Sequence, residues 1–124
     1  MAITRRKRTE QKEQIRFVQY IRTFRPDILI ASIPNGAGVS SHQRIKLTQE
    51  GMLAGMPDLI LLMEGSKTLF IEFKRPDGRG TTSEVQKTLH ERLKGFGFEV
   101  FVATTCEDAL GFLLRKEKKN ETNR

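Results

Sequence analysis

Two short apolar segments joined by a glycine-containing turn constrain the fold of this chain more than any other feature. They are residues 59–63 (LILLM) and 69–74 (LFIEFK), with residues 64–67 between them. Apolar side chains occupy successive positions in both segments, so both faces of each predicted strand need cover, as in the interior of a sheet. The pair therefore predicts a central hairpin with other elements packed on both sides.

The remaining hydrophobic pattern supplies those elements. Helices are expected over 10–24, 41–50, 83–95 and from Thr105 onward, and strands over 28–33, 59–63, 68–74 and 99–103. The order α-β-(α)-β-β-α-β-α predicts an α/β fold with a mixed central sheet flanked by helices on both faces. The 124 residues fit one domain, 10–114, between a basic arm over 1–9 and a basic flexible tail over 115–124.

The positive charge of the chain is concentrated in these two ends. Of the net charge of +7, residues 5–8 contribute four positive charges, and residues 115–124, with five basic and two acidic side chains, contribute three. Basic ends on a neutral middle indicate contact with a polyanion such as a phosphate backbone. Solvated ends that only aid solubility are an equally open interpretation.

The single cysteine, Cys106, excludes an internal disulfide and a cysteine-based zinc site. We expect a protein of a reducing, cytoplasmic compartment, in a bacterial or phage-infected cell. No apolar segment follows the basic start, so no signal peptide is predicted. The longest apolar run, 59–63, is too short to span a bilayer.

Three charged residues interrupt the central hairpin at the end away from its turn: Asp58, Glu72 and Lys74. Because side chains alternate along a strand, their placement depends on the length of the loop. A three-residue loop centred on Gly65 pairs Asp58 with Glu72, and a five-residue loop pairs Asp58 with Lys74. Either odd length puts all three on one face, whereas an even length puts Asp58 on the other.

Two carboxylates on one face of a buried hairpin repel each other unless a proton or a cation lies between them. Oxygen ligands with room for water are those that Mg²⁺ or Mn²⁺ prefers, and such a cation activates water for attack on a phosphate. Lys74 would then hold the attacking water or the phosphate. The alternative is a buried salt bridge, although Lys74 can neutralise only one of the two acids.

These residues also resemble a known family. Pro57-Asp58 followed by Glu72-Phe73-Lys74 resembles the PD…ExK signature of the PD-(D/E)XK nucleases. The run from Gly51 to Asp58, with Gly55 inside it, resembles that of the VRR-NUC family (virus-type replication and repair nucleases), as do Asn35-Gly36 and Gln86. The resemblance covers roughly residues 10–114 and implies an αβββαβ core and a metal-dependent endonuclease.

The resemblance implies a role for each matching position. Asp58, Glu72 and the backbone carbonyl of Phe73 would bind the metal, and Lys74 would position the water. A glutamate of the first helix would reach the same metal. Glu13 fits the family spacing best, and Glu10 is the rival. Gln86 would point into the site, although with Ser83 it also fits a helix-capping box.

The resemblance to stand-alone family members further implies a homodimer that cuts branched DNA such as four-way (Holliday) junctions. Phosphate contacts are predicted at Asn35, Arg44, Lys46, Arg75 and Arg79. His42 and His90 stand alone in the sequence and are interpreted as surface or satisfied residues. Two other functions stay open: a non-catalytic DNA-binding protein on a nuclease-like fold, and a nucleotide-binding domain that uses the glycine-rich loop over 35–38.

Overall fold

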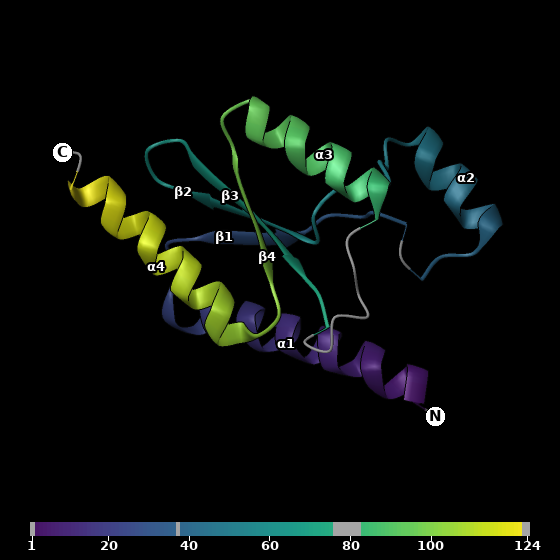
Figure 1. The fold of residues 1–124 in the computed structure, drawn as a ribbon, viewed down its shortest axis with the longest axis horizontal. Coiled ribbons are helices and arrows are strands. Elements are labelled where there is room, and N and C mark those ends of the chain that lie inside the picture. Colours follow the sequence, from purple (N-terminus) through teal and green to yellow (C-terminus); the bar gives the residue numbers. More distant parts are fainter. Residues whose placement is uncertain (1, 37, 76–82, 123–124) are drawn as a thin grey trace.

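A mixed four-stranded sheet in the order β1-β2-β3-β4 forms the centre of the computed structural model, which describes residues 2–36, 38–75 and 83–122 (Figure 1). The strands are β1 (Leu29–Ser32), β2 (Leu59–Met63), β3 (Lys67–Phe73) and β4 (Glu99–Ala103). β1 and β3 both pair antiparallel with β2, whereas β3 and β4 are parallel. The predicted mixed sheet, with the apolar hairpin at its centre, is confirmed.

Four helices accompany the sheet: α1 (Ala2–Phe24), α2 (Ser41–Gln49), α3 (Glu84–Gly95) and α4 (Cys106–Thr122). α1 and α4 pack together on one face, and α3 covers part of the other (Figure 1). α2 has no buried residue and projects from the end of the molecule where α3 begins. Among the described residues, no helix is long and apolar enough to cross a membrane.

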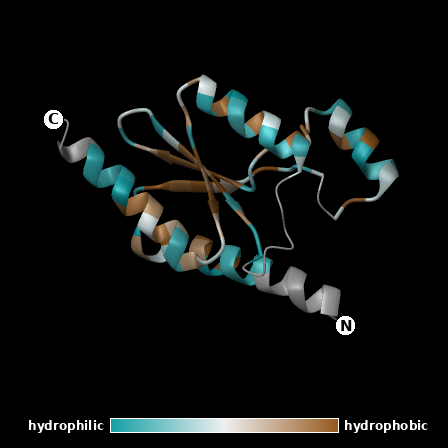
Figure 2. Ribbon diagram, viewed as in Figure 1, coloured by the Kyte–Doolittle hydropathy of each residue, from teal (hydrophilic) through white to brown (hydrophobic). Residues whose placement is uncertain are grey.

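The apolar core lies between the sheet and the α1–α4 layer. Phe17 of α1 contacts Phe73 of β3, with ring centroids 5.9 Å apart, and Phe101 of β4 stacks on Phe112 of α4 at 4.5 Å. Burying a side chain of this size contributes ~2 kcal/mol. Figure 2 shows the resulting concentration of apolar residues along the strands. Glu72 lies between Ile71 and Phe73 on β3, so its side chain points to the opposite face of the sheet, toward His90 of α3.

The hairpin register decides where the charged residues lie. Leu59 pairs with Ile71, and Met63 pairs with Lys67, which leaves a loop of three residues, 64–66. Gly65 (φ 78°) and Ser66 (φ 60°) both adopt the left-handed conformation that closes this loop. The odd length required by the sequence argument is confirmed. The next position of the ladder sets Asp58 opposite Glu72.

Both terminal helices are longer than the sequence pattern indicates. α1 begins at Ala2 instead of residue 10, and α4 continues to Thr122 past the expected tail boundary at residue 115. Apolar periodicity reports only the part of a helix that packs, whereas the charged extensions consist mainly of good helix formers without proline or glycine. α4 is also fastened to the body by Glu117, whose carboxylate accepts hydrogen bonds of 2.6 and 2.7 Å from Arg25.

Candidate active site

Glu72 is a carboxylate buried in the sheet without hydrogen bonds. Its side chain is 1% exposed, and neither Oε1 nor Oε2 has a hydrogen-bond partner among the described residues. Burial, with the nearby charge of Asp58 adding to it, raises the pKa of Glu72 from 4.5 to about 7. Lys74 opposes this shift, since its Nζ lies 3.3 Å from Oε2. The site thus holds negative charge that one lysine does not fully compensate.

Two hydrogen bonds, one from the backbone and one from a side chain, hold the Asp58 carboxylate in place. The N–H of Phe73 donates to Oδ2 at 2.9 Å, and the side-chain amide of Asn35 donates to Oδ1 at 3.1 Å. Asn35 also donates to the carbonyl oxygen of Met56 at 3.3 Å. The structure therefore places Asn35, predicted as a DNA contact, where it orients Asp58.

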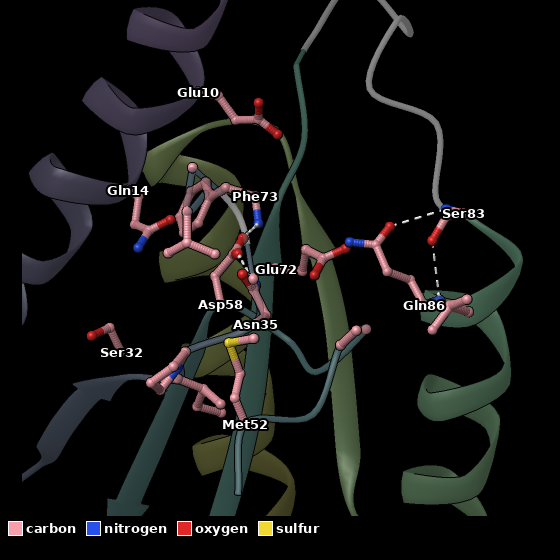
Figure 3. A pocket seen from close by; sticks show the side chains of 18 of the residues that line it. Glu10, Gln14, Ser32, Asn35, Met52, Asp58, Glu72, Phe73, Ser83 and Gln86 are labelled. Atoms are coloured by element: carbon pink, nitrogen blue, oxygen red, sulfur yellow. Dashed lines mark hydrogen bonds between the residues drawn. The ribbon is translucent and has the colours of Figure 1, made fainter. Parts of the chain in front are cut away.

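Lys74 follows β3 directly and is tied to the start of α3. Its Nζ donates to Oε1 of Gln86 at 3.0 Å. The same Oε1 accepts the N–H of Ser83 at 3.0 Å, while the N–H of Gln86 donates to the Ser83 hydroxyl at 3.2 Å. Gln86 thus completes the capping box of α3 and contacts the site at the same time, so the two interpretations of this residue are compatible (Figure 3).

The two candidate glutamates of α1 lie in different places. Glu13 accepts the N–H of Cys106 at 2.9 Å and pairs with Arg16 at 2.9 Å, which places its carboxylate at the start of α4. Glu10 instead lines the cleft beside Asp58 and Glu72, and its charge contributes to the raised pKa of Glu72 (Figure 3). The geometry does not bring Glu13 to the acidic pair, because Glu13 lies about one turn further along α1 and its carboxylate is held there by the Cys106 N–H and Arg16.

A cleft of about 1110 Å³ opens over these residues, lined by α1, the loop after β1, α2 and the start of α3. Within 2–36, 38–75 and 83–122, no three His, Cys, Asp or Glu side chains approach closely enough to form a metal site by themselves. The unpartnered oxygens of Glu72 opposite Asp58 nevertheless fit a cation that prefers oxygen ligands, and backbone oxygen and water can complete its coordination.

The predicted basic contacts are distributed around the cleft. Arg44 of α2 lines it and donates to the carbonyl oxygen of Gly36 at 3.1 Å. Lys46 is exposed on α2, and Arg75 is half-buried next to Lys74. Arg79 lies outside the described residues. Arg44 is thus the predicted basic contact of α2 that lines the cleft itself.

Comparison with known protein families identifies the family to which this chain belongs. The VRR-NUC domain matches residues 2–106 of this chain. The chain belongs to the VRR-NUC family. A solved structure, a VRR_NUC domain protein, has the same fold, with a TM-score of 0.63 and 24% identity over 86% of each chain. No curated protein matches the chain. The resemblance stated from the sequence is confirmed. It implies a nuclease of the PD-(D/E)XK type, a class that acts on nucleic acid and generally uses divalent metals.

His90 is a buried residue that sequence reasoning placed wrongly among surface or satisfied side chains. It is 6% exposed on α3, and its Nε2 lies 4.0 Å from Oε1 of Glu72 without a hydrogen-bond partner. The spacing held a usable signal, because His90 follows Gln86 by four residues and so shares its helix face. His42, by contrast, is exposed on α2 as predicted.

Gly55, the second glycine of the VRR-NUC run, lets α3 approach the Pro57-Asp58 segment. Its φ is +92°, and a Cβ there would lie 2.8 Å from Cγ1 and 3.0 Å from the carbonyl oxygen of Val85, one residue before Gln86. Gly51 also has positive φ, +116°, but a Cβ there meets no described atom within 4 Å. The first glycine of the run is thus required for backbone conformation, and the second for conformation and space.

We therefore expect Gly55→Ala to destabilise the protein by ~2–4 kcal/mol, which combines overpacking with backbone strain. The matched Gly51→Ala carries only the strain and should cost ~1–2 kcal/mol. Urea unfolding of both variants measures the difference. Equal losses of unfolding free energy would contradict the close-approach role of Gly55.

Proposed function

We propose that this protein is a Mg²⁺- or Mn²⁺-dependent DNA endonuclease whose centre is the Asp58–Glu72 pair. The observation that carries the proposal is the buried Glu72 carboxylate, which has no hydrogen-bond partner among the described residues and faces a second carboxylate across the hairpin. Such a pair is unfavourable by itself and favourable with a divalent cation beside it. Membership of a nuclease family supports the same chemistry.

Asp58, Glu72 and the backbone carbonyl of Phe73 would hold the cation, and Glu10 of α1, which lines the same cleft, would assist. A bound cation of this kind lowers the pKa of water and neutralises charge on the phosphate. Lys74, fixed by Gln86, would donate from Nζ to the attacking water or to a phosphate oxygen. Asn35 and the Phe73 N–H keep Asp58 oriented for this task.

DNA would enter along the wall formed by α2. Arg44 and Lys46 on α2, and Arg75 and Arg79 after β3, are the proposed phosphate contacts. The net charge of +7 favours a polyanion and predicts binding that weakens as salt rises. We further propose a homodimer acting on branched DNA such as a four-way junction, since a two-fold pair of sites can cut two strands.

The test is cleavage of labelled four-way junction, flap and linear duplex DNA, with an RNA duplex as comparison, in Mg²⁺, Mn²⁺ or EDTA. We expect metal-dependent cuts in DNA, fastest in the junction, and none in EDTA. Equal rates on duplex and junction would refute the branched substrate alone. Binding of every DNA without cleavage in either metal would refute the endonuclease and favour a DNA-binding protein.

A further inference from the structure

Three buried side-chain atoms without hydrogen-bond partners gather at one point of the described structure: Oε1 and Oε2 of Glu72 and Nε2 of His90. Lys74 approaches Oε2 at 3.3 Å, and His90 approaches Oε1 at 4.0 Å. Buried polar atoms without partners are rare and costly, so a group of them requires an explanation. The role of Glu72 as a metal ligand explains its own oxygens but not the histidine behind them.

We propose that His90 is a positioning residue, whose Nε2–H holds Oε1 of Glu72 and so leaves Oε2, the oxygen beside Lys74, for the cation. The inference rests on the proposed metal site of the nuclease. A ligating carboxylate is commonly fixed by hydrogen bonds from residues behind it, and these partners strongly affect metal affinity.

The separation of 4.0 Å between Nε2 of His90 and Oε1 of Glu72 is longer than a hydrogen bond and short for a bridging water. Two hydrogen bonds through a water molecule would span roughly 4.5 Å or more, so no water fits between the two atoms. A direct hydrogen bond needs them about 1 Å closer, a contraction typical of sites that tighten when occupied. Since His90 and Glu72 are both almost fully buried, neither atom has solvent as an alternative partner.

Helix α3 fixes the position of His90 relative to Glu72. Gln86 and His90 lie one turn apart on it, so the same helix face contacts Lys74 through Gln86 and Glu72 through His90. The helix is seated by Leu93, which is 8% exposed, and by its close approach to Gly55. α3 thus supports both motif residues, Glu72 within β3 and Lys74 directly after it.

The first test is Mn²⁺ binding to the full chain by titration calorimetry at pH 7.5, without DNA. We expect His90→Leu, which keeps the bulk and removes the donor, to bind Mn²⁺ about 10–100-fold more weakly than wild type. His90→Gln should stay within about 3-fold, because its amide N–H can take the place of Nε2–H. In EDTA, His90→Leu should be at least as stable as wild type to urea, since a buried unpartnered polar atom is removed.

Wild-type Mn²⁺ affinity in His90→Leu would overturn the inference, as would equal weakening in His90→Gln and His90→Leu. If His90→Leu fails to fold, His90→Asn replaces it, because its shorter amide cannot reach Glu72 and should bind weakly. ¹⁵N NMR of the wild-type ring should show the Nε2-protonated tautomer, and the Nδ1-protonated tautomer would contradict the contact.

These results can be separated from those of the nuclease itself. If wild type binds Mn²⁺ and His90→Leu binds it weakly, the role of His90 stands even if no DNA is cut, and only the proposed activity fails. If wild type binds no Mn²⁺, the inference fails together with the metal part of the proposed function.

Discussion

Glu72→Gln is expected to stabilise the metal-free protein at pH 8 and to abolish DNA cleavage. The carboxylate lies 1% exposed without a hydrogen bond, so its ionised form is costly in the folded protein. Glutamine has nearly the same shape without the charge. It also removes the principal proposed metal ligand, and we expect the cleavage rate to fall by at least ~10³. The single substitution Glu72→Gln would thus raise the stability of the metal-free protein and lower its activity.

The raised pKa of Glu72 determines how the free energy of unfolding depends on pH. Glu72 has a pKa of about 7 in the folded protein and 4.5 as its unperturbed value. Between these values the folded state binds more protons than the unfolded state, so the free energy of unfolding falls as pH rises. The loss is complete above pH 7 and amounts to about 3 kcal/mol.

Urea unfolding of wild type and Glu72→Gln in EDTA, at pH 5 and pH 8, measures this effect. The stability of wild type relative to the variant should fall by about 2–3 kcal/mol from the lower to the higher pH. Adding Mg²⁺ or Mn²⁺ at pH 8 should stabilise wild type and leave Glu72→Gln unchanged. Equal responses of the two proteins to pH would contradict the raised pKa of Glu72.

Lys74→Met is expected to lower the cleavage rate by ~10²–10³, the usual cost of losing one donor aimed at a transition state. Nζ of Lys74 is 3.0 Å from Oε1 of Gln86, and among the residues that the structure describes Lys74 is the only lysine that lines the cleft. Methionine keeps the length and removes the charge. Single-turnover cleavage with saturating metal separates this effect from any change in metal affinity.

Lys87→Met is the matched control for this variant. Lys87 lies on α3 next to Gln86, but its side chain is 60% exposed and forms a surface ion pair with Glu84 at 3.6 Å. Such surface pairs contribute little, so cleavage should stay within about 3-fold of wild type. Similar losses in Lys74→Met and Lys87→Met would show a general effect of charge on DNA binding and would remove the special role of Lys74.

Much of the fold can be predicted from local sequence patterns: hydrophobic patterning, loop length and helix capping. The central hairpin can be predicted from the sequence, because interior strands carry apolar residues on both faces. The odd number of residues in its loop then places Asp58 opposite Glu72. Ser83 with Gln86 marks the start of α3 through a capping box. These features depend on neighbouring residues, and a single sequence contains them.

The parts of the site that a single sequence could not assign depend on tertiary contacts. Glu10 and Glu13 are indistinguishable as polar residues of one helix, and only the docking of α4 onto α1 assigns Glu13 to the N–H of Cys106. His90 becomes a buried partner of Glu72 only once α3 packs over β4 beside β3. Asn35 is likewise 23 residues from Asp58 in sequence, and no periodicity connects them.

The most direct test of the metal-dependent centre is a metal titration of single-turnover DNA cleavage by wild type, Glu72→Gln and the control Glu91→Gln. Glu91 is on α3 with its side chain 76% exposed, so the same substitution there removes a charge outside the cleft. Cleavage should appear with Mg²⁺ or Mn²⁺ in wild type and Glu91→Gln, disappear in EDTA, and be absent from Glu72→Gln. Cleavage that persists in EDTA, or that Glu72→Gln retains, would contradict a metal site built on Asp58 and Glu72.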